Sequence, residues 1–271
     1  MAFIKKVLIF IISIIAALYG LYQQNTTKDT TQSTTGKTIT QNPAEVKEIL
    51  ARVPKPIGSF GTAKKILYRE IYKGHQETFY CGCDFTTTGK VYLGTCDVTP
   101  RKNAKRAKQL EAEHVMPAYH MGQNRACWAQ GAEVCVDSKG KKFKGRKCCE
   151  KSDEVFKVAH NDLHNLYPAV GEVNGDRSNY KFGMISGEKR AYGQCDFEVD
   201  KDAKRAEPPE NVRGNIARTY FYMEKTYNFP ISKQQRQLFE AWNKSDPVDD
   251  WERERNKRIE KIQGNKNPYI K

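Results

Sequence analysis

Two short stretches of the sequence carry side chains that could do chemistry. The first is Glu113-His114, which is followed by Val-Met-Pro. The second covers residues 162–179 and holds Asp, His, Asn, Glu and Arg between apolar residues. A carboxylate and an amide oxygen suit Mg²⁺ as ligands, and an imidazole free of the metal can act as a base on water. Together with a cation that holds phosphate, such groups could hydrolyse a phosphodiester bond.

Each stretch is weak evidence when taken alone. An adjacent Glu-His pair is usually only exposed polar surface, and Asn and Asp are common at helix caps and turns. If the segment is extended, neighbouring side chains point to opposite faces, so Glu113 and His114 can serve different partners. Pro117 would then end the strand. The residues alone leave Asn165 and Asn174 as alternative amide ligands.

The charge of the chain points to a polyanionic partner. The 271 residues include 46 Lys and Arg against 32 Asp and Glu, which gives a formal net charge of +14. Such a charge suits DNA, RNA or an anionic membrane surface, although solvated lysines alone would give the same composition. The basic residues are spread over 101–108, 139–147 and 201–205. Because no base-reading module is recognisable, we expect phosphate contacts with little sequence preference.

The N-terminal residues predict export. Lys5 and Lys6 precede an apolar run over 7–22, which is typical of an export signal and short for a membrane span. No clean cleavage site follows, so residues 1–22 are either a signal peptide or an anchor that tethers the protein to a membrane. Residues 23–42 are rich in Thr, Gln and Asn and predict a disordered linker. We expect the folded domain to span 43–271.

Eight cysteines agree with an oxidising compartment. Cys81-Gly-Cys83 and Cys148-Cys149 lack the C-x₂-C spacing of zinc sites, so disulfide bonds are favoured over zinc. The sequence therefore predicts a periplasmic or secreted protein.

The elements that must position these residues are predicted from apolar periodicity. Helices are expected over 62–72 and 211–227, after Ser232 as a capping residue, and in a final charged segment that stops at Gly264. Further expectations are a hairpin over 78–98, a basic helical stretch over 101–109 and a Gly- and Lys-rich loop over 131–147. The resulting fold class is α+β, a mixed α/β single domain.

Seven segments, taken together and in order, resemble the bacterial endonuclease I family of periplasmic and secreted nucleases. They are EHVMP, RACW, GRKCC, DLHNLYPAVGEVNGDRSNY, NIARTYFYM, QLFEAWNKSDPVDDWE and IQGNKNPY. The resemblance runs from about Ser59 to the C-terminus. It implies a ββα-metal (His-Me finger) active-site motif and hydrolysis of DNA, and of RNA as well, with Mg²⁺.

The resemblance also implies a role for individual residues. His114 is similar to the general base that takes a proton from water, and Glu113 to a metal ligand. Asn174 resembles the second protein ligand, through its amide oxygen. Arg146 of GRKCC resembles an arginine that holds the cleaved phosphate, a role that suits a planar bidentate donor. Mn²⁺ or Ca²⁺ are alternatives to Mg²⁺, and we expect a monomer without a small-molecule cofactor.

The chain departs from the family pattern after Trp128, where it is longer than the shorter members. The resemblance implies Cys127–Cys149 as the family-like disulfide and Cys135–Cys148 as a bridge that closes the insert.

Two other function classes are compatible with these features. One is a catalytically inactive nucleic-acid-binding protein of the same fold, and the other is a basic protein of membrane surfaces. The remaining histidines are assigned less: His75 is expected to be solvated, His120 to be structural, and His160 is given no role. His164 either orients the metal site or is a buried, hydrogen-bonded imidazole.

Overall fold

The computed structural model describes residues 42–187 and 190–271. The predicted signal or anchor and nearly all of the predicted linker lie outside these residues. Helix α2 (Pro43–Ala51) is the first described element, and the side chain of Asn42 caps it by accepting a hydrogen bond from the Ala44 amide at 3.0 Å. Within the described ranges no helix is both long and apolar enough to cross a membrane.

The element that carries Glu113 and His114 is a strand of a two-stranded antiparallel sheet. Strand β1 (Leu110–His114) pairs with β2 (Leu166–Val170), and helix α9 (Gly171–Arg177) follows β2 without a loop. The junction requires a glycine, because a Cβ on Gly171 would lie 2.5 Å from the carbonyl oxygen of Arg106. Two distant stretches of sequence are thus brought side by side.

The register of this sheet places Glu113 opposite Tyr167 and His114 opposite Leu166. Every residue of β2 is buried, and in β1 only Glu111 is half-exposed. A strand this deeply buried holds the polar side chains of Glu113 and His114 in fixed positions. As expected, Pro117 follows the strand closely and marks the start of the next helix.

A second sheet has three short strands, with β5 in the centre. Strand β5 (Arg205–Glu207) pairs in parallel with β3 (Lys181–Phe182) and antiparallel with β4 (Glu198–Asp200). Strand β3 follows α9 in the chain, and the ring centroid of Phe182 in β3 lies 4.4 Å from the guanidinium carbon of Arg177 at the end of α9.

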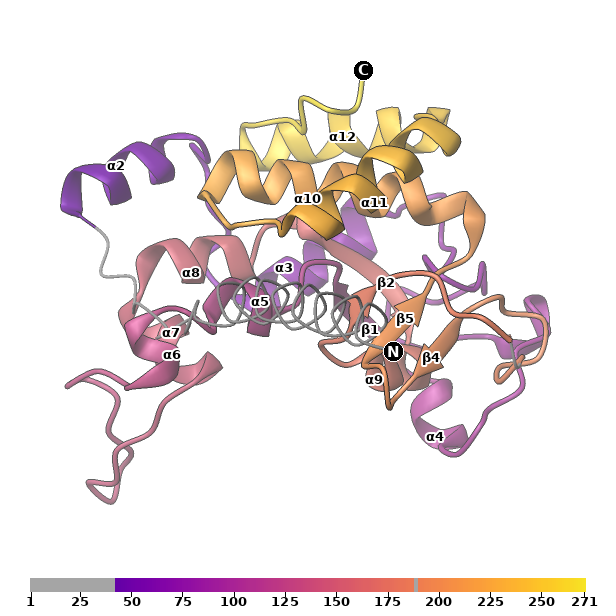
Figure 1. Ribbon diagram of the computed structural model, residues 1–271, viewed down its shortest axis with the longest axis horizontal. Coiled ribbons are helices and arrows are strands. Elements are labelled where there is room, and N and C mark those ends of the chain that lie inside the picture. The colour runs from indigo at the N-terminus through magenta and orange to yellow at the C-terminus, as the bar shows by residue number, and fades with distance from the viewer. Residues whose placement is uncertain (1–41, 188–189) are drawn as a thin grey trace, which may run out of the picture. The chain divides into compact units, whose positions relative to one another are not determined.

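The predicted long helices are confirmed. Helix α3 (Phe60–Ile66) continues as a π-helical turn, η1 (Leu67–Ile71), and the C-terminal third forms α10 (Arg213–Tyr227), α11 (Lys233–Ser245) and α12 (Asp250–Gln263). In Figure 1 these three C-terminal helices form one layer.

The predicted ends of α11 and α12 are confirmed as well. Ser232 caps α11 by accepting a hydrogen bond from the Gln235 amide at 3.3 Å. Gly264 ends α12 with φ 83°, a left-handed backbone that favours glycine.

Shorter helices connect the sheet to the loops: α4 (Ala104–Ala107), α5 (Ala118–Gly122), α6 (Ala126–Ala129), α7 (Arg146–Ser152), α8 (Glu154–His160), and the 3₁₀ turns η2 (Leu93–Thr95), η3 (Leu163–Asn165) and η4 (Glu210–Val212). The basic stretch expected to be helical over 101–109 contains only the single turn α4, because β1 begins at Leu110. Residues 131–145 form the expected loop, which projects from α6 and α7 (Figure 1). The last two residues of the predicted range, Arg146 and Lys147, already belong to α7.

The expected hairpin over 78–98 is wrong as a pair of regular strands. The segment makes only isolated antiparallel bridges, such as Phe85 with Val91. Disulfide bonds cross-link Cys81 to Cys195 and Cys83 to Cys96. We attribute the irregular backbone to these two closely spaced bridges, which pull neighbouring residues toward different partners.

The other two disulfides are those implied by the family resemblance. Cys127 pairs with Cys149, and Cys135 pairs with Cys148. All eight cysteines are therefore bonded, which confirms the expectation of disulfides over zinc.

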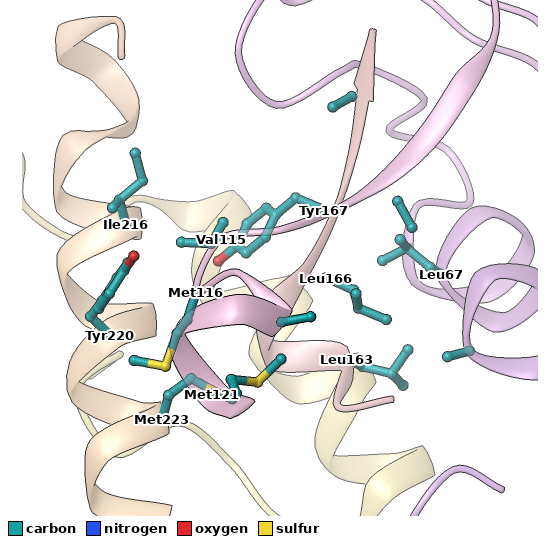
Figure 2. Packing of buried hydrophobic residues seen from close by; sticks show 14 of the residues in the cluster. Leu67, Val115, Met116, Met121, Leu163, Leu166, Tyr167, Ile216, Tyr220 and Met223 are labelled. Carbon is teal, nitrogen blue, oxygen red and sulfur yellow. The ribbon is translucent and has the colours of Figure 1, made fainter. Parts of the chain in front are cut away.

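The hydrophobic core lies between the two-stranded sheet and α10. Figure 2 shows Val115 and Met116, which follow β1, close to Ile216, Tyr220 and Met223 of α10. All five side chains are buried. This packing fixes the end of β1, where Glu113 and His114 lie, against the longest helix among the described residues.

Candidate active site

The four residues predicted to carry the chemistry line one cleft of about 640 Å³. Glu113 and His114 come from β1, Asn174 from α9, and Arg146 from the first position of α7. Other residues of the lining are Phe60, Lys64, Arg106, Glu111, Tyr119, Trp128 and Arg177. The cleft therefore combines acidic, basic and aromatic groups.

Glu113 is almost fully buried, and among the described residues the side-chain contacts to its carboxylate are made through one oxygen. The Oε1 atom accepts a hydrogen bond from the Tyr80 hydroxyl at 2.7 Å and lies 2.9 Å from Nη1 of Arg177. Burial raises the pKa of Glu113, while the charge of Arg177 and the Tyr80 hydrogen bond act in the opposite direction. No side chain in the described ranges donates to Oε2, so this oxygen is available to a ligand.

His114 is oriented by a backbone carbonyl. Its Nε2 lies 2.8 Å from the carbonyl oxygen of His160, which can only accept, so Nε2 carries the proton and Nδ1 the lone pair. The ring stacks on Phe60 with centroids 5.1 Å apart. Burial lowers the pKa of His114 well below its usual 6.5, and the charge effects of His160 and Arg146 lower it further. The imidazole is therefore neutral at neutral pH, as a general base must be.

Asn174 is held by its amide nitrogen. Its Nδ2 donates to Oε2 of Glu111 at 2.8 Å, and Glu111 in turn accepts two hydrogen bonds from Arg106, at 2.8 and 2.9 Å. Arg106 lies so close to Gly175 that a Cβ there would be 2.2 Å from its Nη1. This chain of contacts fixes the orientation of the Asn174 amide and leaves the Oδ1 atom for a ligand.

Asn165, the alternative amide ligand, is used differently. Its Oδ1 accepts a hydrogen bond from the Met116 amide at 2.7 Å, and its Nδ2 donates to the Met116 carbonyl at 3.0 Å. The side chain is completely buried and is not part of the cleft lining. It fixes the backbone just after β1 and does not face the cleft.

Arg146 is exposed at the mouth of the cleft, and the described residues contain no hydrogen-bond or ion-pair partner for its guanidinium. Its charge contributes to the lowered pKa of both His114 and His160, which places it near the imidazoles. A guanidinium that is not paired within the protein is free to bind an anion.

Arg177 is a residue that the sequence reasoning missed. It is fully buried, donates to the carbonyl oxygens of His114 at 2.8 Å and Val115 at 2.6 Å, and pairs with Glu113. It thus connects α9 to the end of β1. A signal did exist, since Arg177 stands three residues after Asn174 and shares its helix face. The roles of Tyr80 and of the His160 carbonyl had no comparable signal.

The remaining histidines lie outside the cleft lining. The expectation for His75 is wrong: its ring is half-buried and stacks on Trp251 with centroids 3.8 Å apart, because burying two flat rings is more favourable than solvating them. His120 is half-buried, and burial lowers its pKa to about 4. His164 is a buried imidazole whose Nε2 lies 3.2 Å from the Asn265 carbonyl.

The donor set suits a hard cation more than a soft one. Residues 42–187 and 190–271 contain no group of three or more His, Cys, Asp or Glu side chains that could hold a metal ion. The cleft instead offers one carboxylate oxygen, from Glu113, and one amide oxygen, from Asn174. Mg²⁺ commonly binds through few protein oxygens and keeps several waters, so these two residues fit such an ion.

Comparison with known proteins shows the family of this chain. Residues 59–271 match the family description Endonuclease I. The chain belongs to the endonuclease I family. It is 46% identical to an extracellular deoxyribonuclease of Aeromonas hydrophila over 225 residues, 82% of this chain and 92% of the relative.

Two further members of the endonuclease I family are similar over comparable lengths. A periplasmic deoxyribonuclease of Aeromonas hydrophila is 45% identical and covers 78% of this chain and 85% of the relative. Endonuclease-1 of Buchnera aphidicola is 43% identical and covers 80% of this chain and 82% of the relative. The protein is accordingly a periplasmic or secreted nuclease, and the family is generally metal-dependent.

Proposed function

We propose that this nuclease is a metal-dependent endonuclease that cuts DNA, and RNA as well, with little sequence preference. The observation that carries the proposal is that three residues lining one cleft each have an acceptor atom without a side-chain partner in the described chain: Oε2 of Glu113, Oδ1 of Asn174 and Nδ1 of His114. The names of the Aeromonas relatives support DNA as a substrate.

The order of elements supports a ββα-metal motif formed by β1, β2 and α9. In this arrangement β1 supplies Glu113 and His114, while α9 supplies Asn174. Mg²⁺, or Mn²⁺ or Ca²⁺ in its place, would be held by Glu113 and Asn174 and would supply charge stabilisation at the phosphate and the leaving oxygen.

His114 acts as the general base in this proposal. Its Nδ1 takes a proton from the attacking water while the new phosphorus–oxygen bond forms and the bond to the leaving sugar oxygen breaks. The leaving oxygen departs with the bonding electron pair and takes a proton from solvent. The imidazolium that results is stabilised by the hydrogen bond from Nε2 to the His160 carbonyl. Phe60 keeps the ring in place by stacking on it.

Arg146 binds the phosphate, and Arg177 positions the site. The guanidinium of Arg146 lies at the cleft and is suited to two parallel hydrogen bonds to phosphate oxygens. Arg177 does not need to touch the substrate, because its hydrogen bonds to the carbonyls of His114 and Val115 already set the position of the strand end.

Plasmid cleavage by the oxidised protein tests the proposal. We expect cleavage with Mg²⁺, none with EDTA, and recovery when Mg²⁺ is restored; Mn²⁺ and Ca²⁺ are compared in the same assay, as is single-stranded RNA. His114→Ala should reduce kcat by about 10²- to 10⁴-fold, the usual contribution of a general base. His75→Ala, at a histidine outside the cleft, is the control and should stay within about threefold of the wild type.

Three results would contradict the proposal. A His114→Ala variant that cuts as fast as the wild type would exclude the mechanism. Salt-sensitive binding of DNA by the wild type without EDTA-sensitive cleavage would favour the inactive nucleic-acid-binding alternative. Binding to anionic liposomes with no nuclease activity would favour the membrane-surface alternative.

A further inference from the structure

One wall of the cleft is aromatic, and phosphate chemistry does not require it. Tyr119 lies on α5, which follows β1 after three residues, and Trp128 lies on α6. Both side chains line the same cleft as His114 and Arg146. Their ring centroids are 5.9 Å apart in an edge-to-face arrangement.

The exposure of Tyr119 is unusual for its position. Its side chain is 40% exposed, and Tyr92 and Tyr269 are the other exposed aromatic residues of the described chain, at 44% and 38%. Of the three, Tyr119 alone lines the cleft. An apolar ring left open at the substrate side gains free energy if a flat partner covers it.

Trp128 makes this wall rigid. A Cβ on Gly122 would lie 2.2 Å from the Trp128 ring, so the indole packs directly against the backbone of α5. The opposite support is Phe156, whose centroid is 6.0 Å away. Because the supporting ring is already fixed, ordering Tyr119 against a ligand costs little conformational entropy.

The chemistry of the cleft points to the kind of partner that would cover the ring. Lys64 and Arg146 in the lining attract the phosphates of a nucleic-acid strand. The flat group next to each phosphate in such a strand is a nucleobase. In a duplex both faces of an internal base are covered by its neighbours. An unpaired base offers a free face, and stacking on an aromatic side chain stabilises it by about 1–3 kcal/mol per base.

We propose that Tyr119, supported by Trp128, forms a stacking subsite for an unpaired nucleobase next to the scissile phosphate. The inference rests on the proposed function and adds to it a class of substrate: single strands and frayed ends bind more tightly than phosphate contacts alone would allow. The subsite accepts any base, because every base has a flat aromatic face.

Steady-state kinetics of three variants test the subsite. Tyr119→Ala should raise KM for a single-stranded oligonucleotide by about 5- to 150-fold, the fold-change that corresponds to the loss of one stacked base. KM for a relaxed, covalently closed circular duplex should change by less than about threefold, and kcat on either substrate by no more. Tyr119→Phe should behave as the wild type, since it keeps the ring. Tyr92→Ala is the control at an equally exposed tyrosine outside the cleft.

An oligonucleotide with abasic sites sharpens the test. On this substrate the wild type and Tyr119→Ala should have the same KM, because no base remains to stack. Equal losses on single strands and duplex, or a Tyr119→Phe variant as weak as Tyr119→Ala, would overturn the inference. The second result would mean that the hydroxyl contacts phosphate.

Binding without catalysis separates this inference from the proposed function. Fluorescence anisotropy of a labelled single strand in EDTA compares wild type and Tyr119→Ala whether or not cleavage occurs. A weaker complex for Tyr119→Ala, with an unchanged dependence on salt concentration, supports stacking over charge. An inactive wild type would refute the proposed function, and equal binding by both proteins would refute the subsite.

Discussion

The cleft and the turn before β2 contain the same types of residue and use them in opposite ways. In the cleft, His114, Asn174 and Glu113 each keep one lone pair that no side chain of the described residues fills. In the turn η3 and its flanks, the side-chain oxygens of Asp162 and Asn165 accept hydrogen bonds from other groups of the protein. The difference shows that a polar residue becomes a ligand or base only when the fold orients it and then leaves an atom unused.

Asp162 shows the structural use most clearly. One carboxylate oxygen accepts hydrogen bonds from the hydroxyls of Tyr222 and Tyr227, and the other accepts them from the His164 amide at 2.8 Å and from Gln263 Nε2 at 2.9 Å. The carboxylate therefore joins α10, the end of α12 and the turn that leads into β2. This network holds the helices and the turn that flank the two-stranded sheet of β1 and β2.

Substitution of each of the two asparagines by alanine is expected to give the largest contrast between activity and stability. Asn174→Ala removes an oxygen from the cleft and should lower kcat/KM by about 100-fold or more, with little change in the free energy of unfolding. Asn165→Ala leaves the buried Met116 amide and carbonyl unpaired and should lower the free energy of unfolding by about 2–3 kcal/mol. Plasmid cleavage and urea unfolding measure the two effects.

The contrast fails if the two variants behave alike. Loss of activity in Asn165→Ala, at a temperature where circular dichroism shows it fully folded, would mean that the amide ligand was assigned to the wrong asparagine.

Asp162→Asn should show an intermediate effect, on stability alone. The new amide group presents a donor to neighbours that are themselves donors, which should lower the free energy of unfolding by about 2 kcal/mol. Urea unfolding measures this loss. At a temperature where the variant is folded, kcat should equal that of the wild type within about threefold, and a much lower kcat would show that the network takes part in the chemistry.

The smallest expected effect is the loss of folding stability at acid pH. Burial lowers the pKa of His164 to about 4, below the ordinary 6.5 of the unfolded chain, so between these values the unfolded state binds more protons and stability falls as the pH falls. Between pH 7 and 5.5 His164 should contribute a loss of about 1 kcal/mol. His164→Gln should remove that part of the slope in urea unfolding, and an unchanged slope would refute the assignment.

Local signals in the sequence were sufficient to predict the helices and to propose Glu113 and His114 as site residues. The apolar stripe through Ile216 and Tyr220 recurs with the helical period, and capping at Ser232 depends only on neighbours in the chain. Glu113 and His114 were identified as a pair because they are adjacent. Such features need no knowledge of the distant chain.

Features that depend on distant contacts could not be predicted in the same way. The carbonyl that orients His114 belongs to His160, and a backbone carbonyl has no signature in the sequence. The hydroxyl of Tyr80 donates a hydrogen bond to Glu113 from a segment whose irregular backbone we attribute to two disulfide bonds. We attribute the failure of the hairpin prediction to the same two disulfide bonds. The choice between Asn165 and Asn174 likewise depended on which amide the fold satisfies.

The loop over 131–145 has a base that is cross-linked twice. The disulfide bonds Cys127–Cys149 and Cys135–Cys148 both end on the adjacent residues Cys148 and Cys149, which directly follow Arg146 and Lys147. Phe143 packs against the core and its amide donates to the Cys135 carbonyl, whereas the turn over 137–141 is hydrogen-bonded within itself. We therefore expect that this turn can be shortened, lengthened or replaced with little displacement of the arginine at the cleft. For protein engineering this makes the loop a graft site, where an affinity tag or a nucleic-acid-binding peptide could be presented beside the substrate entrance.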